Sequence, residues 1–242
     1  MPYRTFTLEQ VANYLHIPPP AVRELAHHGE IPCERQGGRL LFRKPAIDAW
    51  ASQRILGMKP APLADYHRQT TAQARHEDDA AAPVRVGALL LPEWNQPRLP
   101  ARTRASVLRE LAAAAERTGL VNDPATLLAS LREREELCST GLPGGLAIPH
   151  PRQHDPYLLA HSFILLARTP QPIPFGAPDG KQTDLFFLIC CASDRIHLHV
   201  LARLCLLSQQ TSLLVGLRAC DTGEGMAAAV ERAETALVAA GP

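Results

Sequence analysis

Apolar residues in the first part of the chain recur at the spacing of short amphipathic helices. Thr7 is a good N-cap, and Leu8, Val11, Ala12 and Leu15 follow it on one helical face. The run IPPP is then a turn whose last proline can open a second helix. The pattern predicts two short helices in succession.

The second helix carries an apolar stripe that includes Val22, and Gly29 ends it. Two short strands, Ile31 to Glu34 and Leu40 to Phe42, flank a Gly37-Gly38 turn at a separation that fits a β-hairpin. A further short helix ends near Trp50. Helix, turn, helix, hairpin and helix within about fifty residues are typical of a winged helix-turn-helix.

The middle of the chain has a different composition. Residues 59–83 are rich in Ala, Pro, Gln and charge, with no sustained apolar period. This composition predicts a flexible linker of about 25 residues. It would join a first domain at residues 1–58 to a second at residues 84–242.

From Val84 onward, apolar strand-like runs alternate with helical patterns. The run VRVGALLL predicts an edge or first strand, Thr103 caps a helix, and Asp123 with Pro124 opens another. Later in the chain we expect a short apolar run at Leu146 to Ile148, strands at His161 to Arg168 and Asp184 to Cys191, a helix after Ser193-Asp194, and two more helical stretches. Interleaved strands and helices indicate an α/β or α+β sandwich.

Composition narrows the class of protein. Hydrophobic residues make up 46% of the 242 residues and charged residues 20%, which excludes disorder of the whole chain. No apolar run approaches the ~20 residues of a membrane helix, and the N-terminus has no apolar signal segment. We therefore expect a soluble, cytoplasmic protein.

The net charge of +1 is unevenly distributed. Residues 1–60 hold eight Lys/Arg and five Asp/Glu, a balance of +3, which leaves 17 basic and 19 acidic residues, a balance of −2, for the rest. A basic N-terminal segment on a slightly acidic body favours an appended nucleic-acid-binding module.

Cysteines and histidines do not predict a metal site. The six cysteines show no CxxC spacing, and Cys190-Cys191 lies in an apolar run as core residues do. His150 and His154 have metalloprotease spacing, but prolines flank His150 and no Glu follows it. Neither a metal nor a cofactor is expected.

The stretch from Arg134 to His150, REELCSTGLPGGLAIPH, concentrates the residues suited to chemistry. Its glycines let the backbone approach an anion, and a short strand ending in Pro-His fixes an imidazole. Together with PFGAPDG at residues 174–180, an apolar strand at 185–189 and HLHVLA at 197–202, it resembles the enzyme IIA proteins of the fructose/mannitol/nitrogen-regulatory class of the bacterial phosphotransferase system. The resemblance covers about residues 84–237.

This resemblance implies a mixed sheet flanked by helices, and a phosphohistidine mechanism. His150 matches the histidine that takes a phosphoryl group from a histidine phosphocarrier protein. His197, 47 positions later, matches the second active-site histidine, and Arg134, 16 positions earlier, matches the arginine near the phosphate. Ser139 and Thr140 are expected to donate hydrogen bonds to the phosphoryl oxygens.

Two further expectations concern the loops around these histidines. His197 would lie in the first turn of a helix capped by Asp194, where the helix N-terminus favours a phosphate. Pro151 departs from the glycine that commonly follows the active histidine of the family.

The N-terminal stretches TLEQVANYLHI and AVRELAHHGEIPCERQGGRLLFRKPAIDAW resemble the excisionase/MerR-like helix-turn-helix family over about residues 5–52. That family reads DNA with its second helix and its wing. Ala21 stands where the family often has Ser or Thr. The resemblance assigns DNA contacts to Arg23, Arg35, Arg39, Arg43 and Lys44.

Together these features predict a two-domain, phosphotransferase-linked transcription regulator, in which phosphate on His150 changes partner or DNA affinity. Two alternatives stay open at this point. One is a phosphocarrier that passes phosphate to a IIB protein, and the other is a regulator that acts by protein contact without phosphorylation. The expected partners are a phosphocarrier protein, double-stranded DNA and a second copy of the chain in a homodimer.

Overall fold

The computed structural model describes residues 5–77, 84–152 and 157–239. Its N-terminal part is the expected helix-turn-helix with a hairpin wing. α1 (Leu8–Leu15) begins at a capping box that Thr7 forms with Gln10, and α2 (Pro19–His27) opens on the last prolines of the turn. β2 (Glu34–Gln36) and β3 (Arg39–Arg43) form the wing.

The wing turn and its surroundings refine the prediction. Gly37 and Gly38 both have positive φ, +56° and +79°, which a two-residue hairpin turn requires. The first wing strand begins later than expected, and β1 (Thr5–Phe6) adds an unexpected third strand on β3. The next helix, α3 (Lys44–Leu56), runs past the predicted end near Trp50.

The prediction of a flexible linker is wrong for most of residues 59–83. α4 (Pro60–Glu77) is a helix that packs against α7 (Asp194–Gln210), and it buries Leu63, Tyr66 and Thr70. Packing against another element stabilises this helix although its own apolar pattern is weak. Residues 78–83 of the predicted linker lie outside the described residues.

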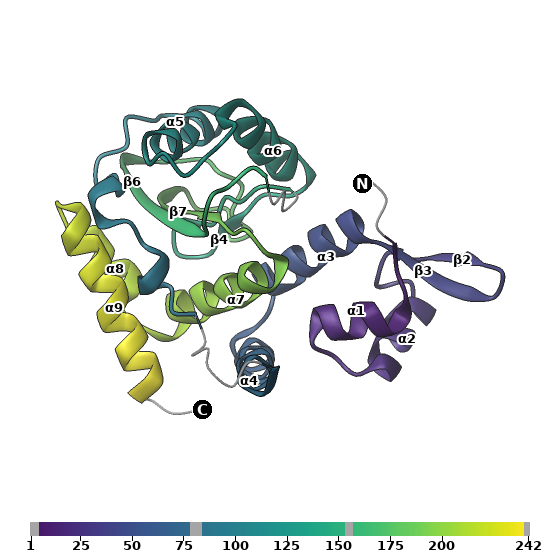
Figure 1. The fold of residues 1–242 in the computed structure, drawn as a ribbon. Helices are drawn as coiled ribbons and strands as arrows, with labels where there is room; N and C mark the ends of the chain where they lie inside the picture. The colour runs from purple at the N-terminus through teal and green to yellow at the C-terminus, as the bar shows by residue number, and fades with distance from the viewer. Residues whose placement is uncertain (1–4, 78–83, 153–156, 240–242) are drawn as a thin grey trace.

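The C-terminal part is a four-stranded mixed sheet in the order β4-β5-β7-β6 (Figure 1). β4 (Gly141–Leu142) is antiparallel to β5 (Leu146–Ala147), β5 is parallel to β7 (Thr183–Cys190), and β6 (Phe163–Ile173) is antiparallel to β7. The expected α/β class and the mixed sheet are confirmed.

Helices cover both faces of this sheet. α5 (Arg104–Arg117) and α6 (Pro124–Leu137) pack on the face that includes Phe163 and Leu165, and Thr103 and Asp123 cap them as predicted. α7, α8 (Leu213–Arg218) and α9 (Gly223–Ala239) pack on the other face, with Ile164 and Leu166. None of the described helices is long and apolar enough to cross a bilayer.

The strand predicted for VRVGALLL is wrong. Residues 87–89 form a short 3-10 helix, η1 (Gly87–Leu89), followed by η2 (Pro92–Trp94), and Leu90 makes one isolated bridge to Ile164. The amides of Val86 and Gly87 donate to the buried Glu234 carboxylate of α9, at 3.0 Å each, so they are not available to a strand ladder.

A histidine pair joins α4 to α7. The His67 ring stacks on His199 with centroids 5.0 Å apart, and His199 Nε2 lies 3.2 Å from the Val84 carbonyl oxygen. Burial, chiefly, lowers the pKa of His67 to about 3 and that of His199 to about 4, with a smaller contribution from the Arg203 cation. Both rings are therefore neutral at pH 7.

Acid should weaken the contact between α4 and α7. Each histidine binds a proton near pH 6.5 when unfolded but only near pH 3–4 when folded, so the free energy of unfolding falls as pH drops below about 6.5. We expect a loss of roughly 1–2 kcal/mol per histidine at pH 5, measured by urea unfolding. His67→Phe keeps the stacked ring and should reduce the pH dependence; an unchanged dependence would contradict this.

Candidate phosphohistidine site

Three side chains that the sequence analysis placed in one site do meet in the structure. His150 follows β5, Arg134 lies in the last turn of α6, and His197 lies near the start of α7. All three are buried, with 2%, 2% and 1% of their surfaces exposed. The His150 and His197 ring centroids are 4.7 Å apart at an interplanar angle of 49°.

Hydrogen bonds set the tautomer of His150. Arg134 Nε donates to His150 Nε2 at 2.9 Å, so Nε2 carries a lone pair and no proton. His150 Nδ1 must then carry the proton, and it donates to the Ile148 carbonyl oxygen at 2.8 Å. The nucleophilic nitrogen of the neutral ring is therefore Nε2.

Arg134 is a buried cation with spare donor capacity. Its Nη1 donates to the Cys138 carbonyl oxygen at 2.8 Å, whereas its buried Nη2 has no hydrogen-bond partner among the described residues. Burial lowers the pKa of this guanidinium, and the neighbouring Glu135 opposes that shift. Arg134 can thus offer a free N–H beside His150 Nε2.

The Ser139 and Thr140 hydroxyls have other partners. Ser139 Oγ donates to the Phe175 carbonyl oxygen at 2.7 Å, and Thr140 Oγ1 donates to Glu135 Oε2 at 2.7 Å. The prediction that these hydroxyls bind phosphate finds no support in these contacts. Their bonds stabilise the turn instead, and the Thr140 carbonyl oxygen accepts from Ile148 N at 3.1 Å, which holds the strand before His150.

Glu135 was not expected to have a role. Its carboxylate also accepts from the Thr140 amide at 3.1 Å, and burial raises its pKa while the Thr140 bonds oppose that shift. It therefore anchors the turn next to the guanidinium.

The glycine-rich turn also differs from the expectation of an anion cradle. Gly144 and Gly145 have φ of +89° and +83°. A Cβ on Gly145 would lie 2.6 Å from Arg218 Nη2 and 2.9 Å from Asp184 Oδ1, which form an ion pair across it. The turn needs glycine because of its conformation and because this ion pair approaches it closely.

The start of α7 is capped by Ser193 and not by Asp194. Ser193 Oγ accepts from Ile196 N, and the His197 amide donates to the Ser193 carbonyl oxygen at 3.1 Å. The His197 amide is thus used within the helix, and only its ring faces the site. His154 lies outside the described residues, and no group of His, Cys, Asp or Glu in the described ranges is arranged to hold a metal.

Ser52, which sequence reasoning did not select, also touches the site. Its Oγ lies 3.2 Å from His197 Nε2, although the two residues are 145 positions apart. Ser52 is on α3 of the helix-turn-helix, so the N-terminal domain contacts the histidine pair directly.

Comparison with known proteins identifies the two domains. The sequence model for the phosphoenolpyruvate-dependent sugar phosphotransferase system EIIA 2 family matches residues 90–232. The chain belongs to this family. A helix-turn-helix domain model matches residues 5–55, so both resemblances drawn from the sequence are confirmed.

Relatives of the EIIA domain include nitrogen regulatory proteins. The chain is 36% identical to the one from Bradyrhizobium diazoefficiens over 54% of this chain and 84% of that protein. It is 28% identical to the one from Pseudomonas aeruginosa over 59% of this chain and 92% of that protein. The crystal structure of the nitrogen regulatory protein IIA-Ntr from Neisseria meningitidis matches 60% of this chain and 98% of its own, with a TM-score of 0.54 and 28% identity.

Proposed function

We propose that this protein is a regulator whose EIIA domain accepts a phosphoryl group on His150 from a histidine phosphocarrier protein. In the same proposal, the phosphorylation state changes DNA binding by the helix-turn-helix domain. The observation that carries it is the hydrogen bond from Arg134 Nε to His150 Nε2, because it defines a buried nucleophilic nitrogen next to a cation.

The transfer needs no proton movement at the acceptor. The Nε2 lone pair of His150 attacks phosphorus, the N–P bond of the donor phosphohistidine breaks, and the donor imidazole keeps that electron pair. Nδ1–H remains bonded to the Ile148 carbonyl oxygen throughout. Arg134 must turn from Nε2 to the phosphoryl oxygens, and its unpartnered Nη2 supplies a further donor.

Intact-mass spectrometry tests this acceptor role. The protein is incubated with phosphoenolpyruvate, enzyme I and a phosphocarrier protein of the phosphotransferase system. We expect a mass increase of about 80 Da that is lost in acid and kept in base. No increase under conditions that label a known EIIA protein would contradict the proposal.

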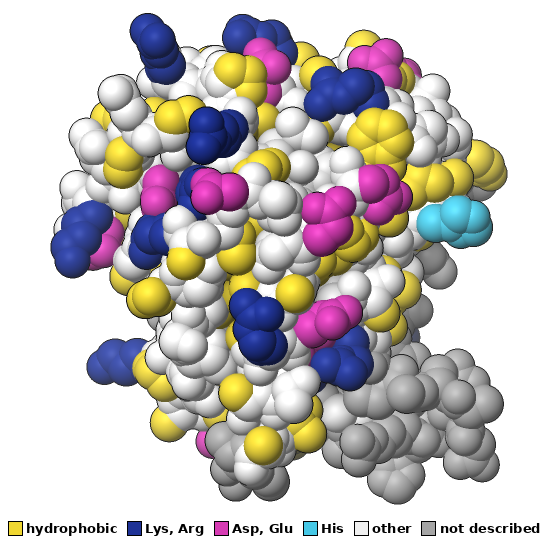
Figure 2. All heavy atoms as spheres, turned by 90° about the vertical axis from the view of Figure 1, so that its left-hand side faces the viewer, with side chains coloured by type: hydrophobic (Ala, Val, Ile, Leu, Met, Phe, Trp, Pro, Cys, Tyr) yellow, Lys and Arg dark blue, Asp and Glu magenta, His cyan; other side chains and the backbone are white. Residues whose placement is uncertain are grey.

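The candidate DNA-contacting arginines are exposed on the expected elements. Arg23 lies on α2, and Arg35, Arg39 and Arg43 lie on the two wing strands. Arg43 Nε pairs with Glu34 Oε1 at 2.7 Å, an ion pair that is well exposed and therefore weak. On the side of the molecule away from this domain, basic and acidic side chains are mixed (Figure 2).

Lys44, the remaining candidate DNA contact, also forms an ion pair within the domain. Its Nζ lies 2.8 Å from Asp48 Oδ2, and Asp48 also accepts from the Tyr14 hydroxyl at 2.7 Å. The Asp48 side chain is only 6% exposed, so Lys44→Ala leaves a buried carboxylate without this cation. We expect it to lower the free energy of unfolding by about 1–3 kcal/mol in urea titrations. Loss of DNA affinity in a variant of unchanged stability would support Lys44 as a DNA contact.

Substitution of Arg39, which directly follows the wing turn, tests DNA binding. Arg39→Ala should weaken binding to all duplexes and reduce the slope of log K against log salt by about one. Arg117→Ala, an exposed arginine of α5, is the control and should leave the slope unchanged. Equal slopes for both variants would remove the wing from the interface.

One module buries only about 600–1,000 Å² on DNA, so we propose that two copies bind adjacent half-sites.

A further inference from the structure

The N-terminal domain contacts the candidate phosphohistidine site through α3. Ser52 on α3 is 4% exposed and contacts the ring of His197, which lies against His150. α3 packs against α7, and in Figure 1 it lies beside the right-hand end of that helix. We propose that α3 occupies the face on which the phosphoryl donor must dock, so that seating of α3 and phosphorylation of His150 exclude each other. This inference rests on the proposed function.

Burial of the nucleophile is the first argument. A phosphocarrier protein must bring its own phosphohistidine to within bonding distance of His150 Nε2. Only 2% of the His150 surface is accessible, and Arg134 Nε already lies 2.9 Å from Nε2. A donor protein therefore requires an open form in which an element covering the ring has moved. α3 is the element of the other domain that contacts this ring pair, through Ser52 and His197.

The contact of α3 also uses a group of the site. Ser52 Oγ and His197 Nε2 form a hydrogen bond, so the second histidine is committed to α3 while the site is closed. A phosphoryl group on His150 would bring two negative charges next to this ring pair and attract the N–H of His197, in competition with the contact to Ser52.

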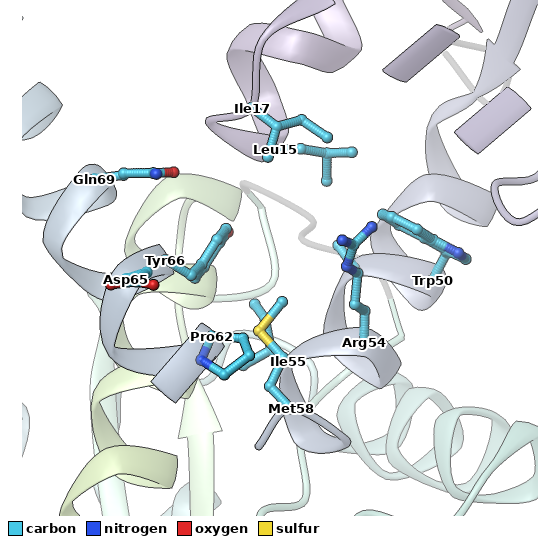
Figure 3. A pocket seen from close by; sticks show the side chains of 11 residues that line it. Leu15, Ile17, Trp50, Arg54, Ile55, Met58, Pro62, Asp65, Tyr66 and Gln69 are labelled. Atoms are coloured by element: carbon cyan, nitrogen blue, oxygen red, sulfur yellow. The ribbon is translucent and has the colours of Figure 1, made fainter. Parts of the chain in front are cut away.

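A hollow beside α3 gives the helix somewhere to move. It has a volume of about 260 Å³ and lies between the end of α1, α3 and α4. Figure 3 shows Leu15 and Ile17 facing Arg54 and Tyr66 across it. The buried Tyr66 hydroxyl has no hydrogen-bond partner among the described residues. α3 lacks close-packed neighbours where it borders this hollow, so fewer contacts have to break there when the helix shifts.

Reciprocity then links the two events. If α3 in place hinders phosphorylation by some factor, phosphorylation disfavours the seating of α3 by the same factor in the equilibrium constants. Because α3 follows directly after the wing strand β3, its release changes how the helix-turn-helix is held relative to the EIIA domain. The contact between Ser52 and His197 thus supplies a physical route from phosphate to DNA binding.

Two matched variants of α3 test whether this helix covers the site. Ser52→Phe places a bulky ring where only a small side chain fits, whereas Gln53→Phe adds the same ring at the neighbouring exposed position. The first readout is carbethoxylation of histidines by diethylpyrocarbonate, followed by peptide mass spectrometry, and it involves no phosphorylation. In the wild type and Gln53→Phe, His150 and His197 should react much more slowly than the exposed His161, and Ser52→Phe should accelerate both by about tenfold or more.

The second readout is the initial rate of labelling by the phosphocarrier protein, which should rise by about tenfold or more in Ser52→Phe alone. Two results would contradict the proposal that α3 covers the site. One is wild-type His150 that reacts as fast as His161, and the other is a Ser52→Phe variant with unchanged rates of carbethoxylation and labelling. Faster carbethoxylation of Ser52→Phe, with no phosphoryl labelling of any variant, would support the covering of the site by α3 and contradict the proposed function. If Ser52→Phe does not fold, as judged by circular dichroism, the smaller Ser52→Gln replaces it with the same expectations.

Discussion

His150→Ala is expected to abolish phosphoryl labelling of the protein by the phosphotransferase system. His150 Nε2 is the unprotonated nitrogen that Arg134 contacts, and alanine leaves no nucleophile at this position. Intact mass should show the increase of about 80 Da in the wild type and none in the variant.

The control for this experiment is His161→Ala. His161 is exposed and lies just before β6, outside the buried ring pair, so this variant should be labelled as fully as the wild type. If His150→Ala is also labelled fully, the acceptor is another residue and the site assignment is wrong.

Arg134→Gln should slow labelling by on the order of 10²-fold without removing the acceptor. The guanidinium both fixes Nε2 as a lone-pair nitrogen and faces the position of the phosphoryl group, whereas a shorter neutral amide does neither well. Rapid-quench labelling at saturating phosphocarrier separates this loss of rate from a loss of donor binding. Circular dichroism should show that the fold persists.

Arg132→Gln is the matched control, because Arg132 is an exposed residue of the same helix. It should be labelled at the wild-type rate.

His197→Ala should be slowed like Arg134→Gln, since both residues position and stabilise charge. Wild-type rates in both His197→Ala and Arg134→Gln would remove these residues from the site.

Local chemistry made much of the fold predictable. Thr103 and Asp123 cap α5 and α6 because short oxygen-bearing side chains satisfy the first free amides of a helix wherever they stand. The buried strand β7 was predictable because its residues form a nearly continuous apolar run. The meeting of Arg134, His150 and His197 followed from the family resemblance and not from any local pattern.

Elements that depend on tertiary contacts were not predictable. α4 has buried side chains at Leu63, Tyr66 and Thr70, but one of these three is polar and the segment is rich in proline and alanine, so its pattern resembled a linker. The segment at Val86 and Gly87 looked like a strand because a sequence pattern cannot show that Glu234 takes its amides.

No sequence pattern indicated the contact between Ser52 and His197. Ser52 lies in a helix of the other domain, and a serine on an amphipathic helix is an ordinary surface residue by pattern. Likewise, the Ser139 and Thr140 hydroxyls suit phosphate by type, and only the folded structure shows that Phe175 and Glu135 accept from them.

The coupling of the two domains is tested most directly by DNA affinity before and after phosphorylation. Full-length protein, unphosphorylated or labelled through the phosphocarrier, is titrated against duplex fragments from near its own gene at several salt concentrations. We predict salt-dependent binding whose affinity differs by about tenfold or more between the two states, and no difference for His150→Ala treated in the same way. Equal affinity of the two states, or no salt-dependent binding in either, would contradict the account.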